Sequence, residues 1–133
     1  PIPPGAKVLI VEDGPTITHG GMPTGSGFQA VKDLDVEIVD PRRSATQAIS
    51  QVYQRFPHIG MVLPAMGYSA EQRRALQQTI DLSDADVVIA GTPINLTRDV
   101  GVRKLVVRAH YSYRDTQTPG LMNLLDDFLA ANG

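Results

Sequence analysis

The chain has 133 residues, a length that suits one domain. Its 12 basic and 14 acidic side chains are interspersed and leave a net charge of −2, so no basic face favours a nucleic-acid partner. The absence of cysteine excludes disulfides, thiolate zinc sites and thiol nucleophiles. No apolar run approaches the roughly 18–20 residues that span a bilayer, and the start of the chain does not resemble a signal peptide. We therefore expect a cytoplasmic location and no membrane partner.

Apolar segments alternate with segments of helical periodicity along the chain. Residues 1–6 are rich in proline and predict a linker, whereas residues 7–133 predict a single α/β domain. The apolar segments predict strands at residues 7–12, 36–39, 60–63, 86–90 and 104–108, the last of them at a sheet edge. The periodicity predicts helices at residues 26–34, 44–56, 69–82 and 119–131.

Two of these helices carry recognisable start signals. Ser44 is a good N-cap for the second helix, and Pro57 ends that helix. Ser69 is followed three residues later by Gln72, the spacing of a capping box, which predicts the start of the third helix at this position.

Strands and helices that alternate at this spacing predict a three-layer, Rossmann-like or flavodoxin-like domain. We expect a mostly parallel five-stranded sheet with helices on both faces and, from right-handed crossovers, the strand order 2-1-3-4-5. Ligands of such sheets bind outside the carboxyl ends of the strands, near the switch in strand order. The segments at residues 12–27, 64–68 and 91–95 should therefore share one rim, and all three are rich in glycine, proline and small polar residues.

Residues 11–22, VEDGPTITHGGM, are the most informative stretch of the chain. Glu12 and Asp13 follow a buried strand, where they could bind magnesium or act as a base; the alternative is an acid that caps the following turn. The glycine-rich loop at residues 14–27 could present backbone N–H groups to an anion. His19 lies in this loop and could hold a phosphate, relay a proton or bind a metal, or it could be a turn residue bonded to nearby backbone.

Other candidate residues lie at the ends of later strands. Arg42 and Arg43 could clamp a phosphate or carboxylate, although such pairs are commonly solvated. The predicted catalytic residues are Glu12, Asp13 and His19, with Asp13 also as a metal ligand. The predicted substrate-binding residues are Thr16, Thr18, Gly20, Gly21, Arg42, Arg43, Thr92 and Asn95.

Several familiar nucleotide and hydrolase motifs are missing. The sequence contains neither the phosphate-binding G-x-x-x-x-G-K-[ST] loop nor the G-x-S-x-G nucleophile elbow. The glycine spacing also disfavours a free-standing dinucleotide-binding domain. A bacterial receiver domain is excluded as well, because the position at the end of the third predicted strand reads Val62-Leu63-Pro64-Ala65 and holds no phosphate-accepting aspartate.

The motif at residues 11–22 resembles one found in a family of predicted P-loop GTPases that includes the archaeal cyclic 2,3-diphosphoglycerate synthetases. Three further stretches resemble the same family, at residues 37–42, 53–68 and 84–96. The resemblance implies that this chain corresponds to the C-terminal domain of a longer nucleotide-dependent protein. It implies magnesium and ATP or GTP for the full-length proteins, with the nucleotide on a separate P-loop domain that would be a partner of this one. We assign no cofactor to the chain itself.

Two functions follow as hypotheses. The first is a domain that holds a small anionic, phosphorylated substrate at the rim beside the first strand, as part of an ATP- or GTP-dependent enzyme. The second is a non-catalytic interaction or oligomerisation module, in which the loop packs against a partner domain or a second copy of the chain.

Overall fold

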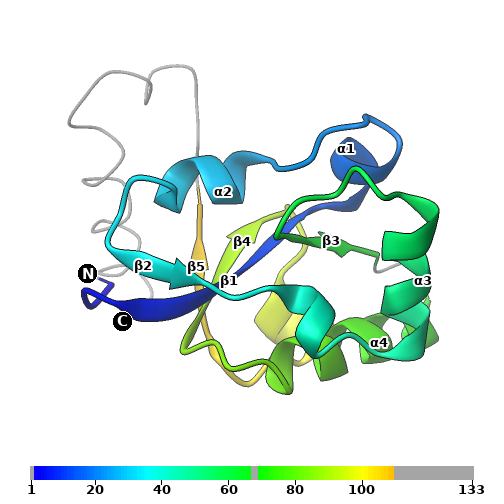
Figure 1. Ribbon diagram of the computed structural model, residues 1–133. Helices are drawn as coiled ribbons and strands as arrows, with labels where there is room; N and C mark the ends of the chain where they lie inside the picture. Colours follow the sequence, from blue (N-terminus) through cyan, green and yellow to red (C-terminus); the bar gives the residue numbers. More distant parts are fainter. Residues whose placement is uncertain (1, 67–68, 110–133) are drawn as a thin grey trace.

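A computed structural model describes residues 2–66 and 69–109 (Figure 1). The helix predicted at residues 119–131 lies outside this part of the chain. In chain order the elements are β1 (Ala6–Asp13), α1 (Gly14–Thr18), α2 (Ser26–Val31), β2 (Val36–Ile38), the 3-10 helix η1 (Pro41–Arg43), α3 (Gln47–Arg55), β3 (Leu63–Ala65), α4 (Ala70–Asp81), β4 (Val87–Gly91), the π-helix η2 (Leu96–Val100) and β5 (Leu105–Arg108).

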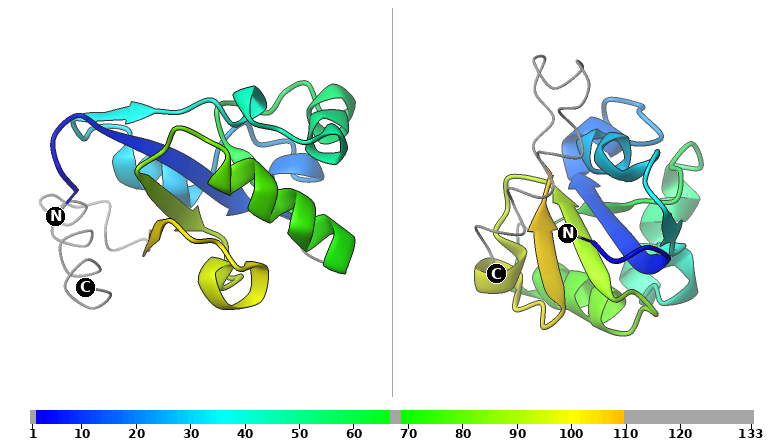
Figure 2. Two further views of the ribbon diagram at one scale, coloured as in Figure 1. Left: turned by 90° about the horizontal axis from the view of Figure 1, so that it is seen from below. Right: turned by 90° about the vertical axis from the view of Figure 1, so that its left-hand side faces the viewer.

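The five strands form one sheet in which every pairing is parallel. Helix α2 lies on one face of the sheet and α4 on the other, so the sheet is the middle of three layers (Figures 1 and 2). These observations confirm the predicted α/β class with a Rossmann-like parallel sheet. Within the described residues β5 pairs only with β4, as expected for an edge. None of the described helices has both the length and the apolar character needed to cross a membrane.

The strand order differs from the predicted 2-1-3-4-5 in the place of β3. The order is β2-β1-β4-β5, and β3 pairs with β1 rather than lying between β1 and β4. Residues Val8 to Glu12 of β1 pair directly with β4, so β2 and β3 share the other edge of β1, opposite its first and last residues respectively. Pro64 gives the physical reason: it has no N–H, so a strand that contains it suits an outer position and not a central one.

Burial on both faces of the sheet explains why the sequences of β1 and β4 are uninterrupted apolar runs. Val8 to Val11 are fully buried, and so are Val88 to Ala90, because helices cover both faces of these strands. Ile17 and Val31 pack from the side of α1 and α2, and Leu76 and Ile80 pack from α4.

One predicted helix start is confirmed and the other is shifted. Ser69 accepts a hydrogen bond from the Gln72 N–H at 3.1 Å while its own N–H donates to the Gln72 side chain, which completes the capping box of α4. Helix α3 begins later than predicted, with Thr46 as its N-cap. The Ser44 hydroxyl donates instead to the Thr79 carbonyl at 2.8 Å, so this serine ties η1 to α4.

We expect replacement of Ser69 by alanine to lower the free energy of unfolding by about 1 kcal/mol, because α4 loses a reciprocal cap. Replacement by aspartate should preserve most of the stability, since a carboxylate also accepts at the N-cap and favours the helix dipole. Chemical denaturation of the two variants measures the difference. Equal losses in both would show that the cap contributes nothing.

Candidate functional site

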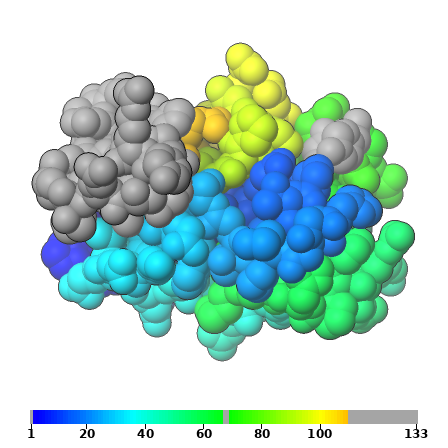
Figure 3. All heavy atoms as spheres, turned by 90° about the horizontal axis from the view of Figure 1, so that it is seen from above, coloured from blue at the N-terminus to red at the C-terminus, as the bar shows by residue number. Residues whose placement is uncertain are grey.

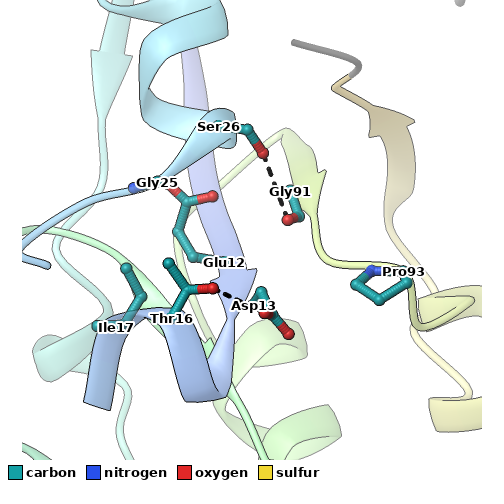
Figure 4. Close-up of a pocket in the computed structure, with 8 residues that line it drawn as sticks. All are labelled: Glu12, Asp13, Thr16, Ile17, Gly25, Ser26, Gly91 and Pro93. Atoms are coloured by element: carbon teal, nitrogen blue, oxygen red, sulfur yellow. Dashed lines mark hydrogen bonds between the residues drawn. The ribbon is translucent and has the colours of Figure 1, made fainter. Parts of the chain in front are cut away.

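A cavity of about 330 Å³ opens at the carboxyl ends of β1 and β4, where the sequence predicted a binding rim. Its size is within the usual range for small-molecule sites. In Figure 3 the blue segment of α1, the lighter blue start of α2 and the yellow-green segment after β4 meet on one face of the molecule. The cavity is lined by Glu12, Asp13, Thr16, Ile17, Gly25, Ser26, Gly91 and Pro93 (Figure 4).

Glu12 forms the buried wall of this cavity. Its side chain is fully buried and its carboxylate accepts hydrogen bonds from the N–H groups of Gly25 at 2.6 Å, Gly27 at 2.8 Å and Phe28 at 3.1 Å. These donors belong to the start of α2, whose first N–H groups have no partner within the helix. The N–H groups of Gly25 and Gly27, within the stretch that the sequence suggested for an external anion, therefore bind a carboxylate of the same chain, and so does the N–H of Phe28 just after it.

Three glycines make room for the Glu12 carboxylate. A Cβ atom on Gly25 would lie 3.1 Å from the carboxyl carbon, and one on Gly27 would lie 2.8 Å from Oε1. A Cβ atom on Gly91 would collide with Oε1 itself. The glycines are needed here because the backbone approaches the acid closely, and not because of a special φ angle: none of the three has a positive one.

Burial dominates the electrostatics of Glu12. Loss of solvent raises the pKa of its carboxyl above the ordinary value, the three N–H groups act in the opposite direction, and the charge of Asp13 adds to the rise.

Asp13 and Thr16 form the polar side of the cavity. Asp13 is the residue before α1, but its side chain makes no bond to the helix backbone. It accepts instead from the Thr16 hydroxyl, with 2.8 Å between Thr16 Oγ1 and Asp13 Oδ2 (Figure 4). Gly14 lets α1 start close to β3, since a Cβ atom there would collide with the Ala65 carbonyl.

The opposite side of the cavity comes from two segments that the sequence placed at the rim, although Ser26, Gly91 and Pro93 were not among the predicted site residues. The Ser26 hydroxyl donates to the Gly91 carbonyl at 3.4 Å, which joins α2 to β4 across the rim (Figure 4). Arg108, at the end of β5, donates to the carbonyls of Thr92 and Ile94 and so fixes the segment that carries Pro93. The signal for Arg108 was its place at the carboxyl end of a parallel strand, the same edge as the rim.

The remaining predicted residues near the rim have local roles and do not line the cavity. Thr18 is buried and donates to the Gly14 carbonyl at 2.9 Å. Thr92 is buried in the rim wall, where its hydroxyl accepts from the Ile94 N–H, and Asn95 caps η2 by accepting from the Arg98 N–H at 2.8 Å. Gly20 lies against the Thr16 carbonyl, and Gly21 has a φ of 70°.

The three predicted basic residues also lie outside the cavity lining. His19 is exposed and meets the Phe56 ring edge-on, with 5.9 Å between the ring centres. Arg42 donates to the carbonyls of Ile59 and Gly60 and stacks over Tyr53. Arg43 lines a separate groove of about 140 Å³ beside β2.

A metal site would rest on Asp13. The described residues contain no group of three or more histidine, cysteine, aspartate or glutamate side chains that could hold a metal ion. Both oxygens of Glu12 already accept hydrogen bonds, so Asp13 is the acid that could offer a magnesium ion an oxygen here.

Comparison with known proteins gives one informative match. No family model and no solved structure matches the chain. The chain is 45% identical over 125 residues to a curated protein named arginine synthetase ArcE, from Thermococcus kodakarensis. The match covers 93% of this chain but only 28% of that protein. Over nearly its whole length, the chain is therefore homologous to one domain-sized part of a larger synthetase-like enzyme.

Proposed function

We propose that this chain is the small-molecule-binding domain of a larger synthetase and that the ligand occupies the cavity between Asp13, Thr16 and Ser26. The carrying observation is the position of this cavity, at the carboxyl ends of β1 and β4, where α/β sheets usually bind their ligands. The similarity to part of a synthetase supports an enzyme rather than an isolated structural module.

The arrangement suits a domain that orients a substrate. Glu12 holds the start of α2 against β1, so that Ser26 and Asp13 line the same cavity. Ile17 and Pro93 supply apolar surface, and Thr16 fixes one oxygen of Asp13. Asp13 would accept a hydrogen bond or a proton from the ligand.

The nucleotide belongs elsewhere in this proposal. The chain has no G-x-x-x-x-G-K-[ST] loop, so ATP or GTP would bind a P-loop domain in another part of the full-length protein. Under the narrower resemblance to cyclic 2,3-diphosphoglycerate synthetases, the ligand would be phosphorylated. Such a ligand would need a magnesium ion beside Asp13, because no basic side chain occurs among the described residues that line the cavity.

Thermal unfolding with a ligand panel tests the proposal. The panel contains L-arginine, because the relative is named for arginine synthesis, and 2,3-diphosphoglycerate, ATP, GTP and orthophosphate, each with and without magnesium. A ligand present at about 100 times its dissociation constant stabilises the folded state by about 2.7 kcal/mol. We expect at least one compound to raise the melting temperature.

Two aspartate variants locate the binding. Asp13→Asn should reduce the ligand-induced shift, whereas Asp33→Asn should preserve it, because Asp33 is exposed and lies outside the cavity lining while the change of charge is the same. A panel that shifts nothing, combined with a molecular mass that rises with protein concentration, would overturn the proposal in favour of an interaction module.

A further inference from the structure

We propose that the ligand faces Asp13 with a positively charged nitrogen group, an ammonium or a guanidinium. This inference rests on the proposed function of the cavity and adds the chemical class of its ligand. It departs from the anionic substrate that the sequence favoured.

The first argument is the sign of the charge. Among the described residues that line the cavity, Glu12 and Asp13 are acidic and none is basic. Arg108 lies at the same edge of the sheet, but its guanidinium donates hydrogen bonds to the carbonyls of Thr92 and Ile94. An unaccompanied phosphate would therefore meet two carboxylates and no cation, which opposes its binding.

The second argument is the supply of hydrogen bonds. The Thr16 hydroxyl donates to Asp13 and the Ser26 hydroxyl donates to the Gly91 carbonyl, so both hydroxyls offer the cavity lone pairs rather than protons. Within the described part of the chain, Oδ1 of Asp13 accepts no hydrogen bond. The N–H groups at Gly25 and Gly27 are already directed at Glu12.

The side-chain oxygens around this cavity are thus acceptors in need of donors. An ammonium carries three donors and no acceptor, and a guanidinium carries five donors in a plane that matches a carboxylate. A magnesium ion also satisfies acceptors, but among the described residues that line the cavity it would find one carboxylate oxygen without a hydrogen bond, Asp13 Oδ1, and the described chain has no cluster of three ligating side chains. The organic cation is the better match.

A pair of small probes that differ in charge tests the inference. Methylguanidinium and N-methylurea have nearly the same shape, but only the first is charged. Two-dimensional NMR of the 15N-labelled chain follows the amides of Gly25, Ser26 and Gly91 during titration with each probe at equal ionic strength. We expect methylguanidinium to bind about tenfold more tightly than N-methylurea, the ratio that a charge-assisted hydrogen bond typically adds.

The variants and a salt titration make the result specific. Asp13→Asn should bring the ratio close to one, and Asp33→Asn should leave it unchanged. In the unmodified chain, 0.5 M NaCl should weaken methylguanidinium and leave N-methylurea unaffected, a readout that does not depend on any variant folding.

Failures of the two proposals are distinguishable. Equal binding of both probes at these amides would overturn the cationic ligand but keep the cavity as a binding site. No response of these amides to any probe would overturn both.

Discussion

Replacement of Glu12 by glutamine is expected to lower the free energy of unfolding by about 1–3 kcal/mol, although the two side chains have the same size. The carboxylate accepts from three N–H groups at the start of α2, and it does so in full burial. A glutamine retains one oxygen and places an NH2 group against the remaining donors. At least one N–H then loses its partner without gaining access to water.

The same substitution should change how stability depends on pH. The pKa of Glu12 is raised in the folded state, mainly by burial, so the folded chain holds this proton more tightly than the unfolded chain does. The stabilising contribution of the proton is complete below the unfolded pKa and is lost as pH rises through the folded one. The deficit of Glu12→Gln relative to the unmodified chain should therefore be larger at pH 4 than at pH 7.

Urea denaturation at a series of pH values measures both effects. Glu37→Gln is the matched control, because Glu37 lies exposed on β2 and undergoes the same chemical change. A Glu12→Gln variant as stable as this control at every pH would show that the bonds to α2 contribute nothing to the fold.

The fold could be predicted from the sequence where a single local pattern decided the structure. The continuous apolar runs of β1 and β4 reflect burial on both faces, and the Ser69–Gln72 spacing placed the start of α4 within a residue. The position of β3 depended on tertiary pairing, and the local pattern that could have indicated its outer position was the proline at residue 64. The start of α3 moved to Thr46 because Ser44 has a partner on α4, which no local pattern shows.

The sequence predicted where the candidate cavity lies, and the chemistry that its residues perform stays a prediction. Glu12 and Asp13 do lie at the rim, together with Thr16. The glycines of the following loop suggested an empty anion site, and sequence alone could not show that Glu12, some 13 to 16 residues earlier in the chain, supplies the anion. His19 and Arg42 were chosen for their charge, whereas their positions are set by contacts with Phe56 and Tyr53.

Among the glycines around Glu12, Gly91 should be the one whose replacement by alanine lowers the stability of the fold most. The new Cβ atom would collide with Glu12 Oε1 and would lie 2.7 Å from the Gly27 nitrogen and 3.0 Å from the Ser26 hydroxyl. Two of these neighbours are held by the bond between Glu12 and α2, so neither can move without breaking it. We expect a loss of about 3 kcal/mol in the free energy of unfolding, at the upper end of the usual cost of overpacking.

A double-mutant cycle separates this collision from a general effect of alanine. In a Glu12→Asp background the carboxylate retracts by one methylene, so Gly91→Ala should cost less there than in the unmodified chain.

Gly21→Ala is the comparison in open space: nothing lies within 4 Å of its Cβ position, but its φ of 70° should cost about 1 kcal/mol of backbone strain. If the Gly91→Ala loss were no larger than the Gly21→Ala loss, or were the same in both backgrounds, close approach to the buried acid could not be the reason for glycine at the end of β4. A loss that shrinks with the shortened acid would instead show that one carboxylate fixes the identity of its neighbours on the first and fourth strands, and with them the shape of the cavity.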